Sequence, residues 1–255
     1  MAEGHRDRLR RRFMEENIDT IPDYIVLERM LQGMITRRDT CELARQLIRE
    51  FGGIPQVIDA PVSELCKVPG MGEAAASYIK LIPDFYRRYC IDKWEKPVIF
   101  SHVDKATKYL AEHFIGYNHE VLIVMCMDSN SKLLACRPVF EGSINAIDIS
   151  VRKVLQFALA FDATRVIIGH NHLHGDALPS LDDLHTTRKI AIALSSAGIH
   201  LDDHIIVSQD DHISLAQSNF LDKITDPKKS EEFFNNLHLS FQAEREATRG
   251  ASHNT

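Results

Sequence analysis

Hydrophobic and polar positions follow two different patterns along the chain, and the first has the periodicity of helices. Up to about residue 92, apolar residues recur at spacings of three and four, as in CELARQLIREF, where Asp39 and Thr40 offer an N-cap. FGGIPQVIDA interrupts this periodicity with two glycines and a proline. SELCKVPGMGEAAASYIKLI then predicts two short helices joined by a Pro-Gly-x-Gly turn. The pattern therefore predicts a small all-helical domain.

The second pattern begins near residue 100 and is typical of buried strands alternating with helices. EVLIVMCMD is almost continuously apolar, as expected of a strand that is covered on both faces. The turn DSNSK and the segment LLACRPVF complete a predicted hairpin. Further strands are predicted at TRVIIGHN, IHLDDHIIVS and DDHISLA, and helices at DKATKYLAEHF, ISVRKVLQFALAF and LDDLHTTRKIAIALSSAG. These elements predict an α+β domain.

Three regions follow from these patterns. They are a helical domain over residues 1–95, an α+β domain over residues 100–221 and a polar C-terminal tail over residues 222–255. WEKPVIFS, with its proline, is typical of a linker between the first two. The tail is expected to contain one helix and then to be disordered.

The composition excludes several classes of protein. The formal net charge is −6, so charge alone predicts no general affinity for nucleic acid or anionic membranes. No apolar run approaches the roughly 20 residues of a membrane helix, and the N-terminus lacks the apolar core of a signal peptide, so we expect a cytoplasmic protein that does not bind membranes. The 5 scattered cysteines indicate reduced thiols. The oligomeric state is not specified.

One stretch, HNHLHGDALPSLDD at residues 170–183, concentrates side chains that can bind a metal. His170 and His172 are two positions apart at the end of a predicted strand, so both point to the same side. A carboxylate from the start of the next helix would complete three ligands and leave a fourth position for water, as in catalytic zinc sites. Asp183 and Asp182 are the two candidates, and residues about 100° apart on a helix cannot both face the ion. His-x-His alone would also fit hydrogen-bonded histidines without a metal.

The wider spacing is more specific. His-x-His, seven residues, Ser180, two residues and Asp183 resemble the JAMM motif of MPN+ metalloproteases. The pattern HNHxxGDxxPSxxDxxxT, with the later DDHIIV, is similar to RadC proteins over about residues 100–217. The resemblance implies a JAB/MPN-like, cytidine-deaminase-like mixed sheet with flanking helices. It also implies one zinc ion per chain, held by His170, His172 and Asp183.

The same resemblance assigns roles to two further residues. Ser180 would orient the reacting carbonyl oxygen, and Glu120, at the head of the first strand, would activate water. Glu141 also lies at a strand end and is the alternative to Glu120. Asp203 and His204 would either hydrogen-bond a ligand imidazole or form a structural pair. The chain departs from the family at residues 173–174, where Leu-His replaces the usual Pro-Ser, and this leaves substrate choice open.

The helical domain contains a motif of its own. VPGMGEAAASYI resembles a helix-hairpin-helix, in which the turn at Gly70 and Gly72 offers backbone N–H groups to a phosphate. Glu73 follows directly and would repel phosphate, so the hairpin could equally serve packing alone. The basic run HRDRLRRR is either a solvated helix face or a further phosphate contact. It ends at Arg10, Arg11 and Arg12.

Three functions are compatible with these motifs. The first is a zinc-dependent hydrolase, which by resemblance would be metallopeptidase-like and act on a peptide or protein. The second is a factor associated with DNA repair or recombination that binds DNA weakly through its N-terminal region, with the zinc domain acting as a nuclease or an interaction module. The third is a metal-stabilised interaction module without turnover.

Overall fold

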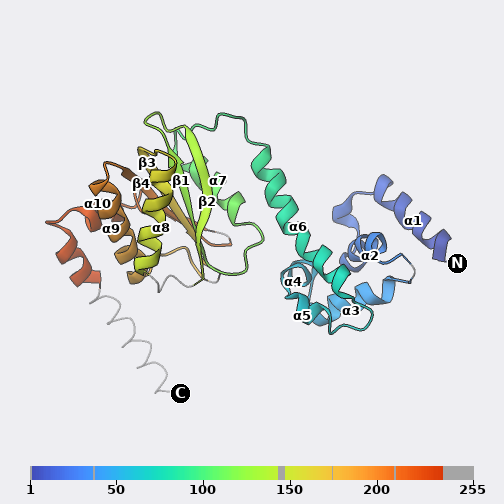
Figure 1. Ribbon diagram of the computed structural model, residues 1–255. Coiled ribbons are helices and arrows are strands. Elements are labelled where there is room, and N and C mark those ends of the chain that lie inside the picture. Colours follow the sequence, from blue (N-terminus) through green and yellow to red (C-terminus); the bar gives the residue numbers. More distant parts are fainter. Residues whose placement is uncertain (1, 37, 143–146, 174, 210, 238–255) are drawn as a thin grey trace, which may run out of the picture. The chain divides into compact units, whose positions relative to one another are not determined.

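The computed structural model describes the chain except for residues 1, 37, 143–146, 174, 210 and 238–255 (Figure 1). Within it, the chain divides into two compact units between Asp92 and Lys93. In the described part of the chain, no helix is long and apolar enough to cross a membrane. We refer to the units as the helical unit and the sheet unit.

The helical unit packs its helices around a small apolar core. They are α1 (Ala2–Glu15), the 3-10 helix η1 (Ile18–Thr20), α2 (Asp23–Met34), α3 (Cys41–Phe51), α4 (Ile54–Asp59), α5 (Val62–Leu65) and α6 (Glu73–Asp92). The core includes Leu27, Leu31, Leu47, Val57, Leu65 and Ile79. Asp39 caps α3, because its side chain accepts the N–H of Cys41 at 2.9 Å. The expected N-cap Thr40 makes no side-chain cap hydrogen bond.

Two segments of this unit differ from the sequence-based expectation. The segment after Gly52 was expected only to interrupt the periodicity, but it forms α4, whose Pro55 lies in the first turn, where a missing N–H costs no hydrogen bond. Gly52 itself ends α3 with a φ of 102°. The second difference is α6, which has 20 residues and continues through Pro83. Proline removes one backbone hydrogen bond, and the turns on either side keep theirs.

The sheet unit contains a five-stranded mixed sheet (Figure 1). Its strands are β1 (Val121–Met127), β2 (Leu133–Glu141), β3 (Arg165–Asn171), β4 (His200–Val207) and β5 (His212–Ser214). Their order is β2-β1-β3-β4-β5, and β3 and β4 are parallel whereas the other pairs are antiparallel. The helices are α7 (Val103–Phe114), α8 (Ile147–Ala160), α9 (Leu181–Ser196) and α10 (Phe220–Thr225). The predicted α+β class and mixed sheet are confirmed.

Each face of the sheet is covered by apolar side chains from helices. One face packs against α8, α9 and α10, in a core that includes Val124, Ile168, Val154, Leu184, Ile190 and Ile224. The other face packs against α7, in a core that includes Ile123, Met125, Ile205, Ala106 and Leu110. All seven residues of β1 are buried, which explains why this strand reads as a continuous apolar run.

Chain beyond residue 222 also contributes to the first of these cores. α10 runs across the expected start of the polar tail, and Phe233, Phe234 and Leu237 pack against the core that α8 and α9 form. Residues 238–255 lie outside the described residues, so the disorder expected for the end of the tail stays a prediction.

Candidate metal centre

Two imidazoles leave the sheet on the same side where β3 ends. His170 is the penultimate residue of β3, and the N–H of His172 still donates to the carbonyl of Val207 in β4 at 2.8 Å. Both residues therefore keep strand geometry, in which alternate side chains share a face. α9 covers this face, and Asp183 in its first turn reaches the same point. The strand end and the helix start together bring the three predicted ligands into one cluster.

The distances within this cluster fit a single metal ion. The Nε2 atom of His170 lies 2.9 Å from Nε2 of His172 and 3.4 Å from Oδ1 of Asp183. The third separation, from Nε2 of His172 to Oδ2 of Asp183, is 3.6 Å. Two ligand atoms bound tetrahedrally to one zinc ion lie roughly 3.3–3.6 Å apart, so the cluster is close to that size. Among the described residues, this is the one group of histidine, cysteine and acidic side chains with such convergence.

The first turn of α9 fixes the carboxylate of Asp183. The Oγ of Ser180 accepts the N–H of Asp183 at 3.1 Å and donates to its Oδ2 at 2.6 Å, while the N–H of Ser180 donates to the same oxygen at 2.8 Å. This capping box aligns Asp183, which is 4% exposed, whereas Asp182 is exposed to solvent. The hydroxyl hydrogen of Ser180 therefore points at Asp183. Its expected role at a substrate carbonyl stays a prediction and would require the hydroxyl to turn away.

The three candidate ligands differ in how their surroundings shift their pKa values. Burial lowers the pKa of His170 to about 4, so this imidazole is neutral near pH 7. The hydrogen bond with Asp183 raises the pKa of His172. Burial would raise the pKa of Asp183, but hydrogen bonds with His172 and Ser180 outweigh it and hold that pKa well below its usual range. Asp183 is thus ionised and His170 carries a free lone pair, and both are the forms that bind a metal.

A buried histidine on β4 supports the cluster from behind. The Nε2 of His204 lies 2.8 Å from Nδ1 of His170, so His204 contacts a ligand imidazole directly. Its neighbour Asp203 has a different role: the carboxylate accepts the hydroxyl of Ser214 at 2.5 Å and the N–H of Ala216 at 2.9 Å. Of the two alternatives considered for this pair, His204 fits the ligand contact and Asp203 fits the structural one.

Glu120 directly precedes β1, near the end of β3 that carries the cluster. Leu122 is paired with His170 at the last position of the register, and Glu120 lies two residues beyond Leu122 in the direction in which β3 ends. The charge of Glu120 contributes to the raised pKa of His172, which is consistent with a short separation. Glu141, the alternative, is 56% exposed and lies 3.2 Å from Nε2 of His119. Of the two glutamates, Glu120 is thus the one whose charge acts on His172, and its expected role in activating water stays a prediction.

Asn171, the residue between the two histidines, holds the backbone around Glu120. Its Oδ1 accepts the N–H of Val121 at 2.7 Å, and its Nδ2 donates to the carbonyl of His119 at 3.0 Å. These two hydrogen bonds are made by the backbone groups on either side of Glu120, and they link this backbone to β3, the strand that carries His170. No local pattern in the sequence points to this role of Asn171, because its partners lie about fifty positions away along the chain.

The loop between β3 and α9 adds one contact to the cluster. The Nδ1 of His172 donates to the carbonyl of Asp176 at 3.2 Å, which orients the outer imidazole. Leu173 is half-buried, and His174, the other departure from the family pattern, lies outside the described residues.

The predicted phosphate-contacting residues lie in the helical unit. Gly70 adopts a φ of 98°, which a turn of this kind requires and side chains disfavour. Arg10 and Arg11 are exposed on α1, whereas Arg12 is paired with Glu16 at 2.7 Å. Gly72 directly precedes α6, and its carbonyl accepts the N–H of Ala76 at 3.0 Å.

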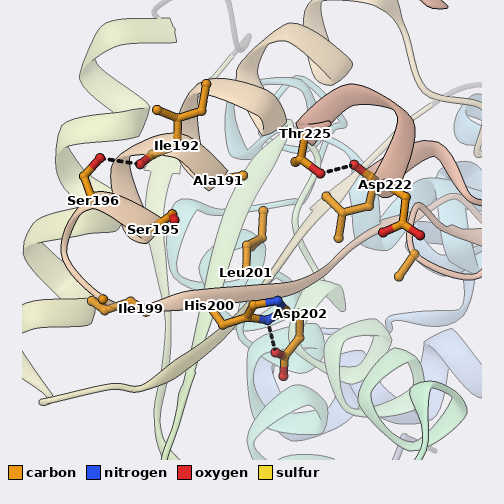
Figure 2. A pocket seen from close by; sticks show the side chains of 13 residues that line it. Ala191, Ile192, Ser195, Ser196, Ile199, His200, Leu201, Asp202, Asp222 and Thr225 are labelled. Carbon is orange, nitrogen blue, oxygen red and sulfur yellow. Dashed lines mark hydrogen bonds and ion pairs between the residues drawn. The ribbon is translucent and has the colours of Figure 1, made fainter. Parts of the chain in front are cut away.

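A hollow of about 640 Å³ in the sheet unit lies where α9 ends and β4 begins (Figure 2). Its polar lining includes His200, whose Nδ1 lies 2.8 Å from Oδ1 of Asp202. Because β3 and β4 are parallel and His170 lies at the end of β3, this hollow is at the opposite end of the sheet from the candidate ligands. It is therefore separate from the candidate metal centre.

A comparison with protein families agrees with this geometry. The family described as a RadC-like JAB domain matches residues 100–220. The match covers the sheet, the three candidate ligands, Glu120 and Ser180, and it leaves the helical unit unassigned.

Proposed function

We propose that residues 100–220, which are a RadC-like JAB domain, hold one zinc ion per chain and hydrolyse an amide bond in a peptide or protein. The observation that carries this proposal is the convergence of three ligand atoms from His170, His172 and Asp183, all within 4.8 Å of one another. The charge of Glu120, which contributes to the raised pKa of His172, supports it. Zinc is the metal that we propose, because two imidazoles and one carboxylate are a common catalytic zinc set.

His170, His172 and Asp183 would hold the ion, and three protein ligands would leave a fourth position for water or substrate. A zinc ion bound there supplies a Lewis acid that acidifies water and polarises a carbonyl. Glu120 accepts the proton of the attacking water and returns it to the leaving nitrogen, as a general base and then a general acid. Asn171 keeps the backbone of Glu120 in place through its bonds to Val121 and His119. The amide class is what the resemblance to the JAMM motif of MPN+ metalloproteases implies.

The test is a matched pair of substitutions at the two strand-end glutamates. Glu120→Gln should retain zinc, measured by elemental analysis, and lose cleavage of a peptide library followed by mass spectrometry, because an amide cannot accept the proton. Glu141→Gln should retain both zinc and cleavage, because its side chain is exposed and paired with His119.

Other outcomes would redirect the proposal. Loss of zinc in Glu120→Gln would make Glu120 a ligand or a structural residue. Unchanged cleavage in that variant would contradict the mechanism. Cleavage of DNA in place of peptides by the wild-type protein would favour the nuclease alternative, and binding of zinc without any turnover would favour a metal-stabilised interaction module.

A further inference from the structure

A chain of hydrogen bonds connects the backbone of α9 to the imidazole of His170. The Oγ1 of Thr187 lies 2.6 Å from the carbonyl oxygen of Asp183 and 2.5 Å from Nδ1 of His204. On the other side of the same ring, Nε2 of His204 lies 2.8 Å from Nδ1 of His170. All four residues are buried, with exposures between 0% and 4%, so water does not compete for these bonds.

The direction of every bond in this chain follows from its first member. A carbonyl oxygen only accepts, so the hydroxyl of Thr187 must donate its single hydrogen to Asp183. The Oγ1 is then an acceptor for His204, whose Nδ1 must carry the hydrogen. The ring of His204 is 2% exposed, and its two nitrogens contact a hydroxyl and an imidazole, so no carboxylate is bonded to it that would compensate a buried charge. In the neutral ring Nε2 carries a lone pair and accepts from His170.

The last step determines the form of the ligand. With its hydrogen on Nδ1, neutral His170 has a lone pair on Nε2, and this is the atom that lies 2.9 Å from Nε2 of His172 and 3.4 Å from Asp183. The opposite tautomer would place a hydrogen where a metal has to bind. We propose that Thr187 and His204 form a tautomer relay that sets His170 in its metal-binding form before any metal arrives.

Thr187 and His204 are positioning residues for the proposed metal site. The expected effect of the relay on zinc affinity rests on the proposed function, whereas its effect on the tautomer of His170 does not. Groups that orient a ligand imidazole typically change metal affinity by about 10–100-fold when they are removed. Without the hydroxyl of Thr187, His204 loses the acceptor for its Nδ1 hydrogen. The ring is then free to place its hydrogen on Nε2 and to donate toward His170, which favours the tautomer that blocks the metal.

α9 offers a matched control in the neighbouring residue. Thr186 is also buried, at 3% exposure, and its hydroxyl has no hydrogen-bond partner among the described residues. Thr187→Val and Thr186→Val therefore make the same nearly isosteric change on the same helix, and only the first removes a member of the relay. Thr187→Ser keeps the hydroxyl and serves as the conservative rescue.

The first measurement is the zinc dissociation constant of the full chain, determined with a competing chelator. We expect Thr187→Val to weaken zinc binding by about 10–100-fold, and Thr186→Val and Thr187→Ser to stay within about threefold of the wild type. A melting curve for each variant verifies that it is folded. Equal losses in Thr187→Val and Thr186→Val would overturn the relay.

The second measurement does not involve zinc or activity. Nitrogen-15 spectra of the imidazoles in the metal-free wild type should show His170 protonated on Nδ1, and Thr187→Val should shift its population toward Nε2. A wild-type spectrum with the hydrogen on Nε2 would overturn the relay even if zinc binds. Conversely, the expected tautomer in a protein that binds no zinc would support the relay and contradict the proposed function.

Discussion

Glu28 in the helical unit and Asp183 in the sheet unit are both buried carboxylates with a histidine beside them. Glu28 is 2% exposed and Asp183 is 4% exposed. The Oε1 of Glu28 lies 2.8 Å from Nε2 of His5 and accepts the side-chain N–H of Gln32 at 3.1 Å. Asp183 instead shares its surroundings with two imidazoles whose nitrogens face one point.

The partners of each carboxylate explain the difference. Those of Glu28 come from α1 and α2, and the contact with His5 ties these helices together, so the group has a structural role. Cys41 lies nearby, but burial and then the charge of Glu28 raise the pKa of its thiol, which keeps it protonated and a poor metal ligand. A buried acid beside a histidine is therefore not sufficient for a metal site. Lone pairs that converge on one position are required in addition.

The largest expected effect tests that convergence directly. His172→Ala should abolish stoichiometric zinc, because two remaining ligands cannot form a three-ligand site. His5→Ala removes the corresponding imidazole from Glu28 and should leave zinc content unchanged. Elemental analysis of both purified variants measures the effect. Full retention of zinc in His172→Ala would contradict the argument that converging ligand atoms distinguish the Asp183 cluster from the Glu28 cluster.

The second effect concerns the packing around β3, the strand that carries His170. A Cβ on Gly169 would lie 2.8 Å from Cδ1 of Leu110 and 3.3 Å from the carbonyl oxygen of Ile205, so the fully buried side chain of Leu110 would have to move and the backbone at Ile205 would have to give slightly. We expect Gly169→Ala to lower the free energy of unfolding by about 1–3 kcal/mol, as overpacking does.

The helical unit provides the control for this substitution. Gly33 lies in α2, and a Cβ there meets no atom within 4 Å. Gly33→Ala should therefore be neutral or stabilise by up to about 1 kcal/mol, because alanine favours the helix. Urea unfolding followed by circular dichroism measures both variants. A loss of stability at Gly33 as large as that at Gly169 would contradict the packing argument.

The distance along the chain between contacting residues explains which features the sequence could predict. His170 and His172 share a strand side, and Asp183 begins the next helix, so local spacing was sufficient to identify them as candidates. The helices and strands of the sheet unit also followed from periodicity. α6 was predicted too short, since local sequence does not reveal that a helix will continue through Pro83.

The supporting residues could not be predicted in this way. The hydrogen bond between His170 and His204 depends on the pairing of β3 with β4, and the hydrogen bonds that Asn171 makes on either side of Glu120 depend on the pairing of β1 with β3. Thr187 follows Asp183 by four positions, and a hydroxyl bonded to that carbonyl is ordinary in helices, so it gave no distinct signal. Which residues meet across two strands is determined by their pairing register, and the register depends on the whole sheet and not on local sequence.

The third effect is a pH dependence that only the Asp183 cluster should show. The pKa of folded His172 is raised, so its contribution to stability in the metal-free protein is fully present below the unfolded pKa and is lost as pH rises through the folded pKa. A metal must displace that proton. Zinc affinity should therefore increase with pH by about tenfold per unit up to the raised pKa and then level off. Chelator competition at several pH values measures this, and an affinity independent of pH would contradict it.

The smallest expected effect is DNA binding, which we assign to the helical unit and expect to be independent of the Asp183 cluster. Arg10 and Arg11 are exposed on α1, the helix that His5 ties to Glu28, and the turn at Gly70 can offer N–H groups to a phosphate. The neighbouring Glu73 and the net charge of −6 oppose this, so binding should be weak, independent of sequence and steeply dependent on salt.

Substitutions in the full chain separate this binding from the metal site. Arg10→Glu combined with Arg11→Glu should weaken binding of a mixed-sequence duplex and lower the slope of log affinity against log salt by about 2. Arg12→Ala should have less effect, because its guanidinium is already paired with Glu16. His172→Ala should leave binding unchanged, as measured by fluorescence anisotropy at low salt. Loss of binding in His172→Ala would move the DNA contact to the sheet unit, and no binding by the wild type would leave the hairpin as a packing element.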